Sequence, residues 1–143
     1  MCGVIGLRCE RDRNDLGATA ARLLRMLEYR GYDSTGAALQ SEDGTVALRK
    51  GVGSPTEVCR RLDIPKLSGS VFCGQVRWAT FGKVDRANAQ PHQVFCKTHL
   101  YGAHNGNITN CAGLKKKLRR LGHRVLSDND GEMLVHLVEH HFD

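Results

Sequence analysis

The sequence predicts a single domain of the α+β or layered α/β class, in which helices are inserted between strands. Its 143 residues are enough for one domain with a two-layer core but few for two domains. Hydrophobic residues make up 41% and charged residues 25% of the chain, as in ordinary soluble globular proteins. Short apolar runs of strand type alternate with amphipathic runs of helix type, without an internal repeat or a clear linker.

The first third of the chain is expected to form a strand, a helix and a hairpin. Residues 4–7 (VIGL) are a short apolar run typical of a buried strand. A helix that ends before Arg30 follows, because one face collects the apolar residues Leu16, Ala20, Leu23, Leu24 and Leu27. Residues 37–40 and 46–49 predict hairpin strands around the turn residues 42–44.

Helices and strands also alternate in the rest of the prediction. Ser54 and Pro55 can cap and open a short helix, and Glu57 completes a capping box. Three further strands are predicted, at residues 71–76, 94–96 and 100–103. Two helices finish the chain, at residues 110–121 and 131–141.

The formal net charge of +6 suggests anionic partners, but the densest basic run, KKKLRR at residues 115–120, lies in one predicted helix. Leu114, Leu118 and Leu121 share the other face of that helix, so a solvated basic face explains the run. No aromatic residues suited to stacking on bases lie nearby, and nucleic-acid binding is not expected. A bilayer-spanning run and a signal peptide are not found, so a cytoplasmic protein without a membrane partner is expected.

Six cysteines are scattered without a CxxC pair, and free thiols are expected. Cys73 and Cys96 lie in apolar runs, where cysteine behaves as a small buried hydrophobe. His136 and His140 stand at positions i and i+4 of the last helix and could share a metal. Because no third ligand is evident, surface histidines and no bound metal are expected.

Several loops carry more specific residues than a connection needs. They are the N-terminus at Cys2, RGYDSTG at residues 30–36, RWATFG at 77–82, HNGNITN at 104–110 and SDNDGE at 127–132. Taken singly, each has an ordinary explanation: Asn-Gly after a strand is a turn signal, for example. Cys2 alone can equally be a small residue that begins a buried strand or a nucleophile that is exposed when Met1 is removed.

Together, Cys2 after Met1, LEYRGYDSTG, RWATFG with NAQPH, HNGNITN and SDND resemble the class II glutamine amidotransferases, in order and over essentially the whole chain. LEYRGYDS and RWAT resemble the glutaminase domain of glutamine–fructose-6-phosphate aminotransferase (glucosamine-6-phosphate synthase), whereas HNGNITN is nearer the wording of amidophosphoribosyltransferases. The resemblance implies an N-terminal-nucleophile hydrolase fold, a four-layer αββα sandwich, over residues 1–143. Because domains of this family continue past the point that matches Asp143, it also implies truncation at the C-terminus and an absent acceptor (isomerase) domain.

The same resemblance assigns catalytic roles to Cys2, Asn105 and Gly106. Once Met1 is removed, Cys2 carries a free α-amino group, whose reference pKa of ~7.7–8.0 suits a base for its own thiol. The Asn105 side-chain amide and the Gly106 backbone N–H would form the oxyanion hole of the reaction.

Glutamine itself is expected to be held at both of its charged ends. Arg77 suits the α-carboxylate, because a guanidinium binds carboxylates through two parallel hydrogen bonds. The α-ammonium needs an anion, and by resemblance this is Asp130 and not its neighbour Asp128.

Four further residues are given roles by the resemblance. Trp78 and Thr80 belong to a segment that forms a lid over glutamine, and His92 of NAQPH is expected to bind substrate. Arg30 is expected to organise the loop beside Cys2. The glucosamine branch commonly has histidine where this chain has Gln75, Phe81 and Gln90, which predicts altered lid packing only.

The expected activity is hydrolysis of L-glutamine to glutamate and ammonia through a Cys2 thioester, without a cofactor. The ammonia would pass to a sugar-phosphate acceptor held by an isomerase domain or a partner chain, as in glucosamine-6-phosphate synthesis, and a homo-oligomer is compatible with this activity. Two alternatives stay open: an amidophosphoribosyltransferase-like glutaminase domain, and a non-catalytic glutamine-binding or interaction module.

Overall fold

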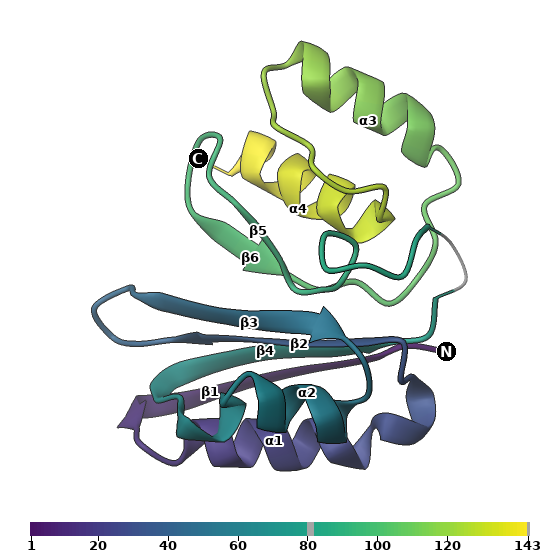
Figure 1. The fold of residues 1–143 in the computed structure, drawn as a ribbon. Helices are drawn as coiled ribbons and strands as arrows, with labels where there is room; N and C mark the ends of the chain where they lie inside the picture. The colour runs from purple at the N-terminus through teal and green to yellow at the C-terminus, as the bar shows by residue number, and fades with distance from the viewer. Residues whose placement is uncertain (80–81, 143) are drawn as a thin grey trace.

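The structure, a computed structural model, describes residues 1–79 and 82–142 and has two sheets between two layers of helices (Figure 1). The larger sheet is antiparallel, with the strand order β1-β4-β2-β3. Its strands are Gly3–Arg13 (β1), Ser34–Gln40 (β2), Val46–Val52 (β3) and Gly69–Arg77 (β4). Six of the seven residues of β2 are buried, because helices cover one face of the sheet and the second half of the chain covers the other.

Two helices, α1 and α2, cover the outer face of the larger sheet (Figure 1). They span Leu16–Met26 and Pro55–Arg61, and the short 3₁₀ turns Glu28–Arg30 and Ile64–Lys66 follow them. The Ser54 hydroxyl accepts a hydrogen bond from the Glu57 N–H at 3.4 Å, so the predicted cap of α2 is confirmed. The main core lies between these helices and the sheet and includes Leu16, Leu24, Leu39, Val58, Ile64 and Phe72.

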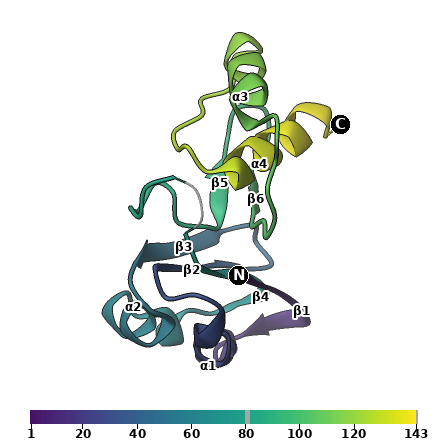
Figure 2. The same cartoon turned by 90° about the vertical axis from the view of Figure 1, so that its right-hand side faces the viewer.

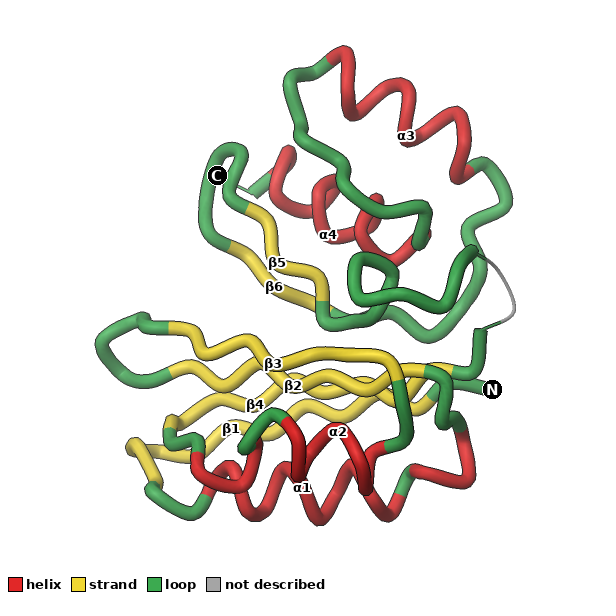
Figure 3. The backbone as a smooth tube through the Cα atoms, viewed as in Figure 1, coloured by secondary structure: helices red, strands yellow, loops and turns green. Residues whose placement is uncertain are grey.

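The second half of the chain adds a two-stranded antiparallel sheet and two more helices (Figures 2 and 3). The elements are His92–Val94 (β5), Leu100–Gly102 (β6), Cys111–Arg120 (α3) and Asp130–His141 (α4). Helix α4 packs on both strands, and α3 packs on α4 over a small core of Leu118, Val125 and Met133. The layers are therefore helices, sheet, sheet, helices, which confirms the expected α+β class and its αββα arrangement.

Some expectations for individual segments were wrong. Strand β1 has 11 residues where an apolar run of four was expected, because its second half is an edge strand with exposed charged residues. Leu121 is 43% exposed just past the end of α3, so it does not share the buried face of Leu118. Cys96 lies in the exposed connection after β5 and is not a buried hydrophobe. None of the described helices is both long and apolar enough to cross a membrane.

Candidate active site

The candidate site lies at one end of the larger sheet, where the antiparallel register brings three sequence motifs together. Gly3 at the start of β1 pairs with Val76 near the end of β4, so Cys2 lies beside the segment that leaves β4. Ser34 at the start of β2 pairs with Arg77, the last residue of β4. In an antiparallel pair, the start of one strand lies beside the end of its partner. Residues that are far apart in the sequence therefore meet at this end of the sheet.

A small cavity of about 30 Å³ marks this end of the sheet. Its lining residues are Cys2, Arg77, Trp78, Gln90, His104, Gly106, Asn107, Asn129 and Asp130. Five of the residues expected from the sequence are thus brought together, and they come from four separate segments. The volume is roughly that of one water molecule, so a ligand of the size of an amino acid requires some of these side chains to move.

Both polar groups of Cys2 are held by the surrounding loops. Its thiol lies 3.5 Å from the carbonyl oxygen of Trp78, and its backbone carbonyl accepts a hydrogen bond from Asn105 Nδ2 at 3.0 Å. Asn105 belongs to the loop HNGNITN at residues 104–110, called the HNG loop below. Asn105 and Cys2 are 103 positions apart, so this contact ties the HNG loop to the start of the chain. Met1 is 76% exposed.

The glycine of the HNG loop lies against the His104 imidazole, which would have to move to admit a larger residue. A Cβ atom at Gly106 would lie 2.7 Å from His104 Nε2. A backbone N–H at such a position can approach a ligand closely, as an oxyanion-hole donor must.

Asp130 begins helix α4 and faces the cavity with a side chain that is 13% exposed. Its Oδ2 accepts a hydrogen bond from the Ile108 N–H at 2.9 Å and lies 3.8 Å from His104 Nδ1. Asp128, the neighbour with which it could be confused, is 66% exposed and pairs with Lys115 Nζ at 2.6 Å. The geometry therefore favours Asp130 over Asp128 as the carboxylate of the site, and it gives Lys115 of the basic helix a structural contact.

Arg77 and Trp78 leave the sheet in different directions. The Arg77 side chain is buried, and its Nη1 donates to the Lys83 carbonyl oxygen at 3.0 Å. The Trp78 side chain is 44% exposed, and its ring packs against Tyr32 with the centroids 5.5 Å apart.

The RGYDS segment supports the end of β4 through residues that the sequence analysis did not single out. The Asp33 N–H donates to the Arg77 carbonyl oxygen at 3.0 Å, and the Asp33 carboxylate accepts from the Ala79 N–H at 2.7 Å. A Cβ atom at Gly31 would lie 2.4 Å from the Arg77 carbonyl carbon, so glycine permits this close approach. The Arg30 guanidinium instead lies over the Tyr29 ring, 5.3 Å from its centroid.

Gln75 and Gln90 hold the backbone of His104, immediately before the Asn105-Gly106 pair. Both side-chain amides donate to the His104 carbonyl oxygen at 3.2 Å, and Gln90 Oε1 accepts from the His104 N–H at 2.6 Å. Both side chains therefore position the HNG loop, a role that the expectation of altered lid packing did not include. Nothing in the local sequence signals this, since the partners are 29 and 14 positions away.

His92 is an expected binding residue that does not line the cavity. His92 is buried on β5, where its Nε2 lies 3.1 Å from Asn129 Oδ1. Burial and the nearby Lys50 ammonium lower the pKa of His92 to about 4, so its ring is neutral at neutral pH. It lies behind Asn129, which does line the cavity, and direct substrate binding by His92 stays a prediction. Thr80 and Phe81 lie outside the described residues.

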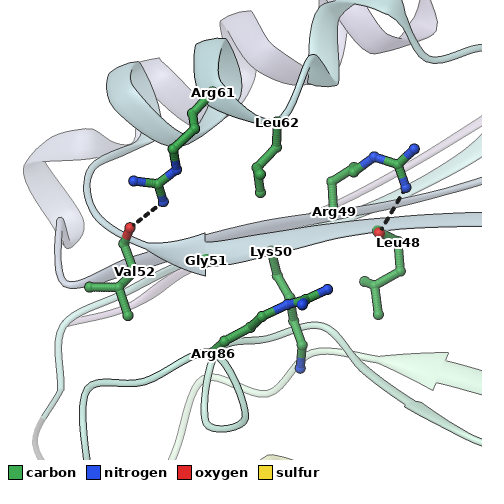
Figure 4. A pocket seen from close by; sticks show the side chains of 8 residues that line it. All are labelled: Leu48, Arg49, Lys50, Gly51, Val52, Arg61, Leu62 and Arg86. Atoms are coloured by element: carbon green, nitrogen blue, oxygen red, sulfur yellow. Dashed lines mark hydrogen bonds between the residues drawn. The ribbon is translucent and has the colours of Figure 1, made fainter.

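A larger cavity of about 480 Å³ lies elsewhere, between β3 and α2 (Figure 4). Its charged lining residues are Arg49, Lys50, Arg61 and Arg86. Arg61 Nη2 donates to the Val52 carbonyl oxygen at 2.7 Å, and Arg49 Nη1 donates to that of Leu48 at 3.2 Å. None of the described residues that line it carries a thiol, a hydroxyl or a carboxylate, so size alone does not locate the chemistry.

The chain is similar to known glutamine amidotransferases in sequence. A family model described as "Glutamine amidotransferase domain" matches residues 77–143. The glutamine–fructose-6-phosphate aminotransferase [isomerizing] of Aeropyrum pernix is 42% identical over 139 residues, which are 97% of this chain and 22% of that protein. The protein of the same name from Pseudomonas syringae pv. tomato is 38% identical over 140 residues, 98% of this chain and 22% of that protein. The chain thus spans about a fifth of the length of these curated relatives.

Two solved structures share the fold. One is described as the allosteric regulatory enzyme of purine biosynthesis, with a TM-score of 0.80 and 28% identity over 97% of this chain and 29% of that one. The other is the glutamine phosphoribosylpyrophosphate amidotransferase of B. subtilis, with a TM-score of 0.75 and 27% identity at the same coverage. In sequence and in fold, the chain is therefore similar to glutamine amidotransferases, and residues 77–143 match the model of their domain.

Proposed function

We propose that this chain carries out the glutaminase half-reaction of a glutamine amidotransferase, with Cys2 as the nucleophile after removal of Met1. One observation carries the proposal: the Cys2 thiol shares a cavity with a buried guanidinium, a largely buried carboxylate and the Gly106 backbone. Hydrolysis of glutamine needs a nucleophile, a cation for the α-carboxylate, an anion for the α-ammonium and donors for an oxyanion. Cys2, Arg77, Asp130 and Gly106 supply these four in one place.

The first step is attack of sulfur on the side-chain amide carbon of glutamine. The free α-amino group of Cys2 takes the thiol proton, and the thiolate forms the S–C bond while the carbonyl oxygen becomes an oxyanion. The Gly106 N–H and the Asn105 amide donate to this oxyanion. Because an amide nitrogen has two hydrogens, Asn105 can hold the Cys2 carbonyl with one and the oxyanion with the other.

The second step releases ammonia and restores the thiol. The α-ammonium of Cys2 returns its proton to the amide nitrogen, the C–N bond breaks, and a thioester between Cys2 and the glutamyl group remains. A water molecule then attacks the thioester carbonyl carbon while the α-amine accepts its proton. The S–C bond breaks, glutamate leaves, and the α-ammonium returns the proton to the Cys2 sulfur. The base is the same group throughout, which requires that the nitrogen of Cys2 be an amine and not the Met1–Cys2 amide.

The acceptor of the ammonia is proposed from the relatives. The curated relatives are named glutamine–fructose-6-phosphate aminotransferases, and this chain matches about a fifth of their length. We infer a sugar-phosphate acceptor, held by protein outside residues 1–143, either a further domain or a partner chain. Residues 1–143 then form the glutaminase domain of the assembly, and a homo-oligomer of that assembly is compatible with it.

The test uses the 143-residue chain with Met1 removed, as verified by intact-mass measurement. Incubation with diazo-oxonorleucine, a glutamine-analogue electrophile, should add one label per chain, and peptide mapping should place it on Cys2. Excess glutamine should slow the labelling, and a coupled assay should detect ammonia. The Cys2→Ala variant should lose both label and ammonia release, whereas Cys9→Ala, which removes a half-buried thiol of β1, should keep both.

Three results would contradict the proposal or a part of it. If the processed chain neither turns glutamine over nor is protected by it from labelling, the site is not a glutaminase. If calorimetry detects glutamine binding without ammonia release, the chain is a non-catalytic glutamine-binding module. Retention of Met1 in a chain that nevertheless releases ammonia would refute the role of the α-amino group.

A further inference from the structure

A second cluster of reactive side chains lies away from Cys2, where the β5–β6 connection meets helix α4. Cys96 comes from that connection, His123 from the connection between α3 and α4, and His136 and Glu139 from α4 itself. One ligand atom from each residue can be chosen so that all four lie within 4.8 Å of one another. His123, His136 and Glu139 are buried, with exposed fractions of 4%, 1% and 0%, and Cys96 is exposed.

The geometry points to a divalent metal site with zinc as the preferred ion, formed by Cys96, His123, His136 and Glu139. Zinc takes four ligands in a tetrahedron, and sulfur, imidazole nitrogen and carboxylate oxygen are its usual donors. The charges also agree: a thiolate and a carboxylate with two neutral imidazoles balance one divalent cation, which is required when the cation is buried.

The distances between the ligand atoms are close to those of a tetrahedral site. Glu139 Oε2 lies 3.1 Å from His123 Nδ1 and 3.2 Å from His136 Nδ1. Cys96 Sγ lies 3.9 Å from the same His136 nitrogen. Metal–ligand bonds of ~2.0–2.3 Å at tetrahedral angles separate the ligand atoms by about 3.3–3.7 Å. Shifts of a few tenths of an ångström suffice for these three pairs, whereas the other pairs, which lie within 4.8 Å, close by up to about 1 Å when an ion is coordinated.

Each ligand is also oriented by a group behind it, as metal ligands usually are. His136 Nε2 is buried without a hydrogen-bond partner and lies 3.7 Å from a carboxylate oxygen of Glu132. When a metal occupies Nδ1 of His136, the ring proton is on Nε2. The Nε2–H group can then donate a hydrogen bond to the Glu132 carboxylate. On the far side of His123, Nε2 lies 3.0 Å from His140 Nδ1.

The two anionic ligands are held by backbone N–H groups. Glu139 Oε1 accepts from Lys97 and Thr98 at 2.9 and 3.3 Å, which leaves Oε2 directed at the two histidines. Cys96 Sγ accepts from the Arg124 N–H at 3.2 Å, a contact that stabilises a thiolate over a thiol.

The site would have a structural role in a part of the fold that has little apolar core. The layer of α3, α4 and the β5–β6 hairpin has a buried apolar cluster of only three residues, against eleven in the main core. A metal there joins three chain segments that otherwise meet through few apolar contacts, as metals do in small domains. The sequence expectation of surface histidines without a metal did not anticipate this, because His136 is buried and its partners come from distant segments.

The experiment uses the 143-residue chain, stripped with a chelator and titrated with Co²⁺ and Zn²⁺. We expect one ion per chain, a thiolate-to-cobalt charge-transfer band with the intense visible bands of tetrahedral Co²⁺, and a higher Tm with Zn²⁺. Cys96→Ser should abolish the charge-transfer band. Cys2→Ala, Cys9→Ala, Cys73→Ala and Cys111→Ser should keep it, and these four controls exclude the other thiols that are not fully buried.

Glu132→Gln should keep the band and weaken binding by about 10–100-fold, the usual effect of removing a carboxylate behind a histidine ligand. X-ray absorption of the zinc-loaded wild-type chain should show one sulfur at ~2.3 Å and three lighter ligands at ~2.0–2.2 Å. This measurement needs no variant, so it decides the case even if a substitution prevents folding. Binding below one ion per chain, a zinc spectrum without sulfur, or a band that survives Cys96→Ser would overturn the proposal and leave a hydrogen-bonded His–Glu–His network that shares a proton.

Discussion

Replacement of Gln90 by methionine tests whether Gln75 and Gln90, the glutamine pair that bonds the His104 backbone, hold the HNG loop. Gln90 is 2% exposed, and its side chain both donates to the His104 carbonyl at 3.2 Å and accepts from the His104 N–H at 2.6 Å. Methionine has a similar length and no hydrogen-bonding amide. In Gln90→Met, the His104 carbonyl keeps its bond from Gln75, but the His104 N–H loses its partner.

The magnitude follows from these contacts. One hydrogen bond of ordinary net value is lost, ~0.5–1.5 kcal/mol, and one buried N–H is left unpaired at ~1–3 kcal/mol. The free energy of unfolding should therefore fall by about 2–4 kcal/mol. Because Asn105 and Gly106 follow His104 directly, their donors should also shift, and kcat for ammonia release should fall by about 10–100-fold.

Urea denaturation measures the first effect and a coupled ammonia assay the second, both on the processed chain. Gln93→Met is the matched control, since Gln93 is only half-buried and bonds the exposed His99. It should change the free energy of unfolding by less than about 0.5 kcal/mol. If Gln90→Met is as stable as Gln93→Met and releases ammonia at the wild-type rate, the loop does not depend on the glutamine pair.

Three further predictions concern other residues of the fold and the site. Because the pKa of His92 is about 4 when folded and ~6.5 when unfolded, the unfolded chain binds the extra proton, and stability should fall by about 3 kcal/mol from pH 7 to pH 4. Denaturation of the variants at both pH values measures this fall in the free energy of unfolding. His92→Gln should lack the part of the fall that is due to His92, and His99→Gln should keep it. Leu24→Ala, at a fully buried core position, should cost ~2–5 kcal/mol in the same assay, and a cost below 1 kcal/mol would contradict its place in the core. Asp130→Asn should raise KM for glutamine by 10-fold or more, because a charged hydrogen bond is worth ~1.5–3 kcal/mol. Asp128→Asn removes an exposed carboxylate and should leave KM unchanged. Equal effects of the two substitutions would contradict the assignment of Asp130 to the α-ammonium.

The sequence predicts most elements of this fold because each has a local signal. The turn at residues 42–44 joins β2 and β3 as expected, and the Ser54 hydroxyl caps α2. The layer order came from the family resemblance, and periodicity alone left it open. Element boundaries failed where tertiary contacts decide them. The strand predicted at residues 94–96 lies instead at His92–Val94, and the Glu139 carboxylate binds the backbone of Lys97 and Thr98 just beyond it.

The candidate site was predicted in part for the same reason. Cys2, Arg77, Trp78, Gly106 and Asp130 belong to motifs that can be read along the chain, and they line one cavity. The residues that position them were missed, because their partners are distant in sequence. Asp33 binds a loop that begins 44 residues later, and Gln75 binds the backbone at position 104. Such contacts have no periodic signature.

The hydrogen bond between Asn105 and Cys2 has a consequence for the maturation of the protein. It is made to the carbonyl of Cys2, on the side of the residue that removal of Met1 does not alter. Met1 is 76% exposed and is accessible to an aminopeptidase in the folded chain. The precursor can therefore complete the arrangement of its loops first and gain its proton acceptor afterwards, so that a single peptide-bond cleavage converts an assembled but silent site into a working one.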